Sequence, residues 1–356
     1  MSRFLTEKHN GLSPYVPGEQ PKDDQYIKLN TNELPFPPSP LAQRLAREAA
    51  GTVNLYCDPE CTALRKTAAE VWNVDPDEIM FANGSDDVLN YAFSVFCDEE
   101  HPLVFPDVTY SFYTSIAKLN HVPYEEIPVD EEFRILPEDY YSCNKNVLLA
   151  NPNAPSGIAL PLSVIEKILQ TNPDNIVMID EAYIDFGGET AAKLIDQYNN
   201  LVVIRTFSKS YGMAGARLGA AIACKELIED MNRLRNSLNP YCINSMTMQA
   251  GIGALLDRSY FESCLKRIGA IREDAAEKLR AAGFTVTPST TNFLFVKHPA
   301  YPGKEIYEDL KKKNILIRHF NTPRLKEWAR ISIGSEEEMD VLLETLLGLL
   351  KERTDA

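Results

Sequence analysis

Three hydrophobic runs in the first two thirds of the chain are continuous rather than alternating. They are NVLLA at 146–150, NIVMID at 175–180 and LVVIRTF at 201–207. Strands that are apolar on both faces are covered on both sides, which is typical of parallel sheets with helical crossovers. Helical patterns such as PLSVIEKILQTNP separate them. The sequence therefore predicts an α/β fold with a mainly parallel sheet flanked by helices.

The pattern changes at both ends of this region. Residues 1–35 are rich in proline and have little helical periodicity, so we expect an extended arm. After about residue 240, long helical patterns alternate with short strands such as NILIRHF and WARISIG. We therefore predict a large domain over 36–240 and a smaller α+β domain over 241–356, as expected for a chain of 356 residues.

Charge and composition narrow the class of partner. The chain has 36 basic and 51 acidic residues and a net charge of −15, which argues against nucleic acid. Seven scattered cysteines, with no zinc-like spacing, indicate reduced thiols in a cytoplasmic protein and no metal site. The polar N-terminal stretch does not resemble a signal peptide, and no apolar run is long enough to cross a membrane.

The stretches that directly follow the three buried strands are rich in chemically active residues. They are NPNAPSG, DEAY and SK, and in a parallel sheet they would meet at one edge. Lys209 lies there, and Thr206, Ser208 and Arg217 supply hydroxyl and guanidinium groups suited to a phosphate. An amine beside a phosphate site suggests a phosphorylated aldehyde cofactor held as a Schiff base, such as pyridoxal phosphate.

Pyridoxal phosphate also needs a carboxylate to keep its ring nitrogen protonated. Asp180 ends one buried run, and Tyr183, three residues later, could contact the phenolic oxygen of the cofactor. The turn NGSDD opens a helix whose N-terminus could bind phosphate, and Tyr110 could stack on the ring. Each feature alone also fits an ordinary surface lysine, cap or core aromatic. Their joint occurrence at strand ends favours a cofactor site.

At this point the chain resembles a known family. The segments SKSYGMAGARLG, DEAYIDF, NPNAPSG and ANGSDDVL together are similar to fold-type-I pyridoxal-phosphate aminotransferases. Within these, the chain resembles the histidinol-phosphate aminotransferases, because of the arm (LSPYVPG, IKLNTNELPF) and the C-terminal ILIRHFNTPRLKEWARISIG. The resemblance covers nearly the whole chain.

The resemblance implies a role for each site residue. Lys209 would bind the cofactor covalently and then transfer the substrate proton, Asp180 would pair with the pyridinium nitrogen, and Tyr183 with the phenolic oxygen. The other implied cofactor contacts are Ser85, Asp86, Thr206, Ser208 and Arg217 at the phosphate, Tyr110 on the ring and, from the neighbouring subunit of a homodimer, Tyr56.

The substrate site implied by the resemblance consists of Tyr15, Asn32, Arg318 and Arg330. One position departs from the family pattern: the asparagine that usually precedes the P-[ST]-G sequence is Ala154 here. Either Asn153 moves to the phenolic oxygen or Tyr183 makes this contact alone, and we favour Asn153. The alternative that Asn151 compensates stays open.

The implied activity is transamination between L-histidinol phosphate and 2-oxoglutarate, which gives imidazole-acetol phosphate and L-glutamate in histidine biosynthesis. Two alternatives use the same scaffold: an aromatic-amino-acid transaminase and a decarboxylase of a phosphorylated amino acid. A non-catalytic regulator is a further alternative, against which the intact Lys209, Asp180, Tyr183 and Arg217 argue.

Overall fold

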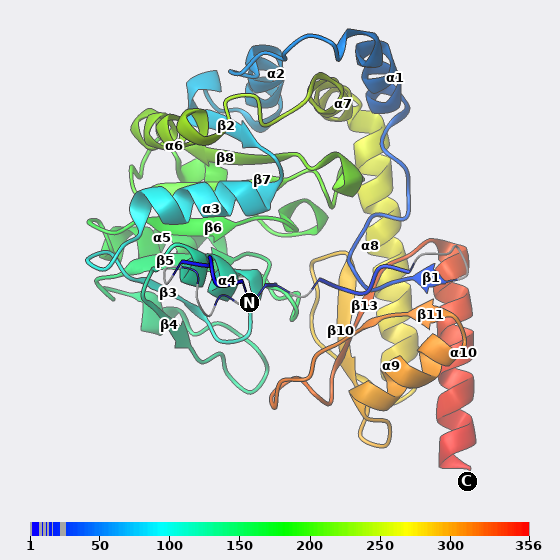
Figure 1. Cartoon of the computed structure of the whole chain (residues 1–356). Coiled ribbons are helices and arrows are strands. Elements are labelled where there is room, and N and C mark those ends of the chain that lie inside the picture. Colours follow the sequence, from blue (N-terminus) through cyan, green and yellow to red (C-terminus); the bar gives the residue numbers. More distant parts are fainter. Residues whose placement is uncertain are drawn as a thin grey trace.

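A seven-stranded mixed sheet forms the centre of the larger part of the molecule (Figure 1). This computed structural model describes residues 2–6, 9, 12, 14–15, 17–21 and 26–355. Five strands are parallel, while β2 and β8 are antiparallel to their neighbours, which confirms the predicted α/β fold. The strand order is β2 (Ile79–Ala82), β8 (Gly219–Ala223), β7 (Leu201–Thr206), β6 (Val177–Asp180), β5 (Asn146–Ala150), β3 (Leu103–Pro106) and β4 (Tyr124–Ile127).

Both faces of this sheet are buried, as the continuous hydrophobic runs predicted. Successive residues of a strand point to opposite sides, so Leu148 and Met178 lie on one face and Leu149 and Ile179 on the other. The helices that contribute to the first face are α3 (Ser85–Phe96), α4 (Phe112–Leu119) and α6 (Lys225–Leu238). The opposite face packs against α5 (Leu162–Thr171), α2 (Thr62–Trp72) and α7 (Ser245–Leu256).

A smaller antiparallel sheet lies beside the first, and the long helix α8 (Arg258–Ala281) leads to it (Figure 1). The last helix, α10 (Glu336–Thr354), begins with a capping box between Ser335 and Glu338. The strands of the small sheet, in order, are β12 (Arg318–His319), β13 (Ala329–Ser332), β10 (Phe293–Lys297) and β9 (Thr285–Val286), and helix α9 (Gly303–Lys312) joins the same part.

The segment NILIRHF forms two short strands instead of the single strand that its sequence predicts. β11 (Ile315–Leu316) pairs in parallel with β1 (Ile27–Lys28) of the arm, whereas β12 pairs with β13 in the small sheet. The arm therefore provides the partner strand for β11, and the small sheet provides the partner strand for β12. Residues 1, 7–8, 10–11, 13, 16 and 22–25 of the predicted arm lie outside the described residues.

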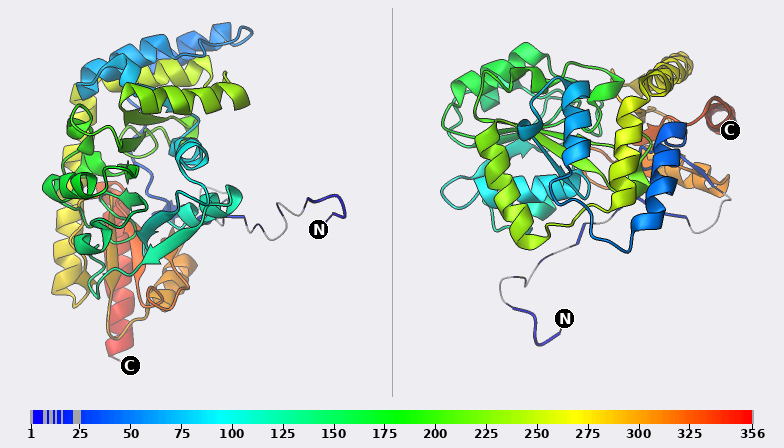
Figure 2. Two further views of the ribbon diagram at one scale, coloured as in Figure 1. Left: turned by 90° about the vertical axis from the view of Figure 1, so that its left-hand side faces the viewer. Right: turned by 90° about the horizontal axis from the view of Figure 1, so that it is seen from above.

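The first helix of the chain, α1 (Pro40–Ala49), lies along α7 on the outside of the molecule (Figure 2). Met248 and Leu255 of α7 share a hydrophobic cluster with Phe81 of the large sheet. Helix α7 therefore packs against the large part of the molecule. The predicted limits at residues 35 and 240 themselves stay predictions.

The segment AAKLIDQYN, which its pattern predicts as a helix, forms only the 3-10 turn Ala191–Leu194. The buried carboxylate of Glu181 accepts hydrogen bonds from the Thr190 hydroxyl at 2.6 Å and from the Ala191 backbone N–H at 2.6 Å. These tertiary contacts hold the start of the segment, and they override the local helical pattern. Among the described helices, none is both long and apolar enough to span a membrane.

The close packing of β8 against the start of α3 leads to a stability prediction. A Cβ built on Gly219 would lie 2.3 Å from the Ser85 nitrogen, whereas one built on Gly269, inside α8, would meet nothing within 4 Å. We expect G219A to destabilise the fold by about 1–3 kcal/mol through overpacking. We expect G269A to stabilise it by about 0.5–1 kcal/mol, because alanine is the better helix former.

Urea unfolding of both variants, followed by circular dichroism, measures these changes against the wild type. If G219A unfolded at the same urea concentration as the wild type, the inferred close approach of β8 and α3 would be wrong.

Candidate functional site

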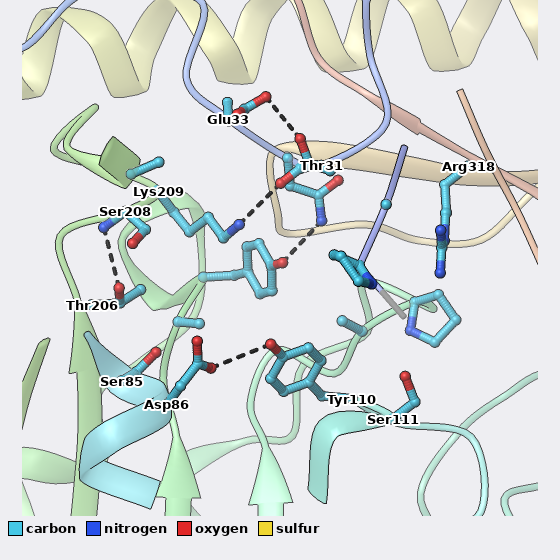
Figure 3. A pocket seen from close by; sticks show the side chains of 18 of the residues that line it. Thr31, Glu33, Ser85, Asp86, Tyr110, Ser111, Thr206, Ser208, Lys209 and Arg318 are labelled. Atoms are coloured by element: carbon cyan, nitrogen blue, oxygen red, sulfur yellow. Dashed lines mark hydrogen bonds between the residues drawn. The ribbon is translucent and has the colours of Figure 1, made fainter. Parts of the chain in front are cut away.

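A cavity of about 440 Å³ opens at the carboxyl ends of β5, β6 and β7 (Figure 3). Ala150, Asp180 and Thr206, the last residues of these three strands, all line it. The opposite side comes from the arm and from β12 and β13 of the small sheet. The strand-end stretches predicted to meet at one edge of the sheet therefore do meet there.

Lys209 follows β7 and extends into the cavity from the loop after the strand (Figure 3). Its Nζ donates a hydrogen bond to the backbone carbonyl of Thr31 at 3.0 Å, and it lies 5.8 Å from the centre of the Tyr183 ring. The lysine is partly buried. Its amine is thus directed at the space shared with the other site residues rather than at bulk solvent.

Asp180 is only 5% exposed, and its carboxylate has two hydrogen-bond donors. The Tyr113 hydroxyl donates to Oδ2 at 2.7 Å, and the Ala182 backbone N–H donates to Oδ1 at 3.1 Å. Burial raises the pKa of Asp180 to about 6, because two hydrogen bonds offset only part of the lost hydration. A cation bound beside this carboxylate would favour its ionised form.

The N-terminus of α3 lines the cavity, and its residues Ser85 and Asp86 lie on the same side as Thr206 and Ser208 (Figure 3). Gly84 precedes the helix with φ +88°, in the left-handed region that favours glycine, and a Cβ there would lie 2.6 Å from Arg217 Nη2. Ser85 and Asp86, the first residues of the helix, line the cavity, and the unpaired backbone N–H groups of a helix N-terminus suit a phosphate.

Polar side chains complete this wall. Arg217 lies 3.0 Å from the Asp86 carboxylate, and its Nη1 donates to the Ser208 hydroxyl at 3.5 Å. The Thr206 hydroxyl accepts a hydrogen bond from the Ser208 backbone N–H at 3.2 Å. An arginine, two hydroxyls and a helix N-terminus thus converge within one wall, as the sequence predicted. They form the donor set that a phosphate dianion needs.

Tyr110 and Tyr183 line the cavity from separate elements. The Tyr110 hydroxyl donates to Asp86 at 3.3 Å (Figure 3). The Tyr183 hydroxyl accepts a hydrogen bond from Asn32 at 2.9 Å, and Asn32 in turn accepts one from Ser332 at 2.8 Å. The arm and the small sheet therefore hold Tyr183 in place.

Arg318 and Arg330 both line the cavity and lie directly opposite each other in the β12–β13 register. Nη2 of Arg330 donates to the Asn30 carbonyl at 3.0 Å, but its buried Nε has no hydrogen-bond partner among the described residues. Burial lowers the pKa of Arg330. Within the described part of the chain neither arginine has a carboxylate partner, so this pair of like charges is suited to an anionic ligand.

Two of the predicted site residues do not line the cavity. The buried Asn153 side chain donates to the Val108 carbonyl at 2.9 Å and accepts from the Thr109 hydroxyl at 2.7 Å, so both of its polar atoms are engaged elsewhere. Ala154 lines the cavity instead, and a contact of Asn153 with the cofactor stays a prediction. Asn151 is likewise engaged with Leu160.

Tyr56 is the second such residue. It is 84% exposed on the outside of the molecule and stacks on Tyr241, with ring centres 4.5 Å apart. It contributes nothing to the cavity of its own chain.

Sequence reasoning missed Tyr113 and Thr31. Tyr113 lies in a helical pattern where an aromatic residue indicates core, and no local signal shows that its hydroxyl reaches Asp180, 67 positions away. Thr31 acts through its backbone carbonyl, which is independent of its side chain. Only its position in the arm segment IKLNTNELPF could have drawn attention to it.

Comparisons with known proteins identify the family. The sequence model described as "Aminotransferase class I and II" matches residues 24–346, and the chain belongs to this family. It is 44% identical to the histidinol-phosphate aminotransferase of Chromohalobacter salexigens, over 97% of this chain and 99% of that protein. It is 42% identical to the protein of the same name from Clostridium acetobutylicum, with the same coverage.

Solved structures agree on the fold. The histidinol-phosphate aminotransferase of Sinorhizobium meliloti in complex with pyridoxal-5'-phosphate superposes with a TM-score of 0.90 at 24% identity and covers 99% of both chains. The histidinol-phosphate aminotransferase of Clostridium acetobutylicum gives a TM-score of 0.84 at 26% identity, over 92% of this chain and 99% of that chain. The fold is therefore that of the fold-type-I pyridoxal-phosphate aminotransferases.

The raised pKa of Asp180 predicts how the stability of the cofactor-free protein depends on pH. A carboxyl group with a higher pKa in the folded protein than in the unfolded chain binds its proton more tightly when folded. Its stabilising contribution is present below about pH 4 and is lost as the pH rises toward about 6. Relative to D180N, which cannot titrate, the wild type should lose on the order of 2–3 kcal/mol across this window.

Urea unfolding of the two cofactor-free proteins at several pH values measures this difference. Y113F serves as the matched variant, because removing the hydrogen bond that favours the ionised carboxylate should move the transition to higher pH. Parallel stability profiles for wild type and D180N would contradict the raised pKa.

Proposed function

We propose that this chain is a pyridoxal-phosphate-dependent histidinol-phosphate aminotransferase that acts in histidine biosynthesis. It exchanges the amino group of L-histidinol phosphate with the keto oxygen of 2-oxoglutarate, giving imidazole-acetol phosphate and L-glutamate. The observation that carries the proposal is that Lys209 and the buried Asp180 share one cavity with three arginines. The full-length similarity to curated histidinol-phosphate aminotransferases supports the same activity.

The residues of the cavity fit pyridoxal 5'-phosphate. The wall formed by Ser85, Asp86, Thr206, Ser208 and Arg217 would hold the phosphate, and Tyr110 would lie against the ring. Asp180, with its pKa raised by burial, would hold a proton at the ring nitrogen, and Tyr183 would donate to the phenolic oxygen. When bound, the cofactor supplies an electron sink for the charge that develops at the substrate Cα.

Lys209 performs the proton transfers. Its Nζ is held by the Thr31 carbonyl on the arm side of the cavity. An amine in this position can remove the proton from the substrate Cα and return it to a neighbouring carbon, as a general base and then a general acid. The partly buried surroundings reduce competition from water, since the arm and small sheet cover the cavity.

Arg318 and Arg330 bind the substrate anion in both half-reactions, together with Tyr15 and Asn32. Histidinol phosphate has a phosphate and glutamate has carboxylates, and a guanidinium fork binds either group with charge-assisted hydrogen bonds. The opposed placement of the two arginines on β12 and β13, without carboxylate partners among the described residues, supports this role.

The active unit we propose is a homodimer in the cytoplasm. Tyr56 is exposed and lies near other exposed apolar side chains, among them Val53 and Leu55, which is typical of an interaction surface. In this arrangement Tyr56 would reach the phosphate bound by the other subunit, which agrees with its absence from the cavity of its own chain.

Replacing the proposed proton-transfer residue should remove activity. We expect K209A to lose the covalently held cofactor and to lower turnover of histidinol phosphate by about 10²–10⁴-fold, because no other amine replaces the general base. The visible absorbance of the purified protein and steady-state kinetics measure the two effects. K193A removes an exposed lysine paired with Glu189 and should behave as wild type. Near-normal turnover in K209A would refute the assignment.

The substrate preference tests the function itself. The wild type should have a higher kcat/KM for histidinol phosphate than for phenylalanine or threonine phosphate. R330A should lower kcat/KM for histidinol phosphate by about 10–100-fold, since each charge-assisted contact contributes about 1.5–3 kcal/mol.

R280A, which removes an exposed arginine of α8, provides the control for this substitution. A higher kcat/KM for phenylalanine than for histidinol phosphate would favour an aromatic transaminase, and release of carbon dioxide from threonine phosphate would favour a decarboxylase.

A further inference from the structure

Arg324 connects the small sheet to a loop of the large one. It lies in the loop between β12 and β13, within residues 320–328. Nη1 donates to the Asp107 carboxylate at 2.6 Å, and Nη2 donates to the carbonyls of Val129 at 3.0 Å and Asp130 at 2.9 Å. A single guanidinium thus holds three acceptors that lie about 200 positions earlier in the chain.

Asp107 is itself held firmly at the end of β3. Its second carboxylate oxygen accepts from the Val129 backbone N–H at 3.0 Å, and its own N–H donates to the Ile127 carbonyl at 2.9 Å. The side chains of Arg324 and Asp107 remain 36% and 23% exposed. Ion pairs this exposed contribute little to stability, so the main consequence of this one is geometric.

Asp107 begins a segment, residues 107–113, that carries several groups of the site. Thr109 and Tyr110 line the cavity, and the Tyr113 hydroxyl donates to Asp180. The buried Asn153 holds the middle of the segment by its two hydrogen bonds to residues 108 and 109. Arg324 at one end and Asn153 in the middle therefore determine where the segment lies.

The loop that carries Arg324 is tied to the substrate side of the cavity. It connects β12, which carries Arg318, to β13, which carries Arg330, and Phe320 at its start lines the cavity. Trp328 at its end stacks on Phe295 with ring centres 4.7 Å apart, so the loop is packed at both ends. Its position and that of the two arginines are thus set together.

We propose that Arg324 is a positioning residue that aligns the 107–113 segment with the substrate arginines. It touches neither cofactor nor substrate, and acts through Asp107 on Tyr110 and on the Tyr113 hydrogen bond to Asp180. The segment begins at Asp107, which binds Arg324, and ends at Tyr113, which binds Asp180. A displacement of Arg324 would therefore change both sides of the cavity. The inference rests on the proposed transaminase function, since that activity is its readout.

The test compares R324A with a matched control. Arg353 binds the Glu305 carboxylate and the Ala300 carbonyl, lies over the Tyr301 ring, and is 38% exposed, so R353A removes equivalent contacts far from the cavity. R324A should lower kcat/KM for histidinol phosphate by about 10–100-fold, as small misplacements of catalytic groups do. R353A should leave it unchanged, with any shift in melting temperature similar for both variants.

A double-mutant cycle separates positioning from a general structural role. The effects of R324A and Y113F on kcat/KM should be non-additive, because both act on the same hydrogen bond to Asp180, whereas those of R353A and Y113F should add. R324K, which keeps the charge but not the fork, should recover only part of the activity. D107N keeps an acceptor for the Val129 N–H and should lower kcat/KM as R324A does. It provides the test if R324A does not fold.

Equal kcat/KM for R324A, R353A and wild type, or additive effects with Y113F, would overturn the proposal. A wild type that fails to turn over histidinol phosphate would instead overturn the proposed function. In that case the role of Arg324 can still be tested with glutamate. The measurement is the change in the visible absorbance of the bound cofactor when glutamate is added, compared between R324A and R353A.

Discussion

The buried carboxylate of Asp180 is the constraint on which the site depends. A charge at the end of a central strand, only 5% exposed, is unfavourable unless donors or a cation compensate it. Two hydrogen bonds do so partly, and the pKa stays raised to about 6. In the site we propose, the protonated ring nitrogen of the cofactor would supply the missing cation. The feature that weakens the cofactor-free site is therefore the same one that suits it to an electron-sink cofactor.

The rest of the cavity distributes charge in a complementary way. The helix N-terminus and Arg217 form one cationic region, and Arg318 and Arg330 form another on the opposite sheet. Between these regions lies Lys209, which bonds the Thr31 carbonyl of the arm. Two anionic groups, one from the cofactor and one from the substrate, would thus be held at opposite ends, with the proton-transferring amine between them.

Such an arrangement requires that two sheets keep a constant separation. The arm contributes through β1 and through Asn32, which bonds both Tyr183 and Ser332. The ion pair between Arg324 and Asp107 joins the two sheets at a second place. The contact between Arg324 and Asp107 is polar and partly exposed, so its value lies in alignment more than in stability. The hydrophobic clusters of each part supply the stability itself.

Much of this was determined by the sequence alone: the α/β class, the ends of the buried strands, and the placement of Asp180, Lys209 and Arg217 at one cavity. These depend on continuous apolar runs and on the rule that parallel strands end at one edge, which are local or topological properties.

Only the tertiary structure decided the positions of Asn153 and Tyr113 and the division of NILIRHF between two sheets. Each depends on a partner far away in the chain: Val108, Asp180 and the arm strand β1. A hydrogen bond between such distant groups leaves no pattern in the local sequence, because hydrophobic periodicity reports which face of an element is buried and not what that face meets.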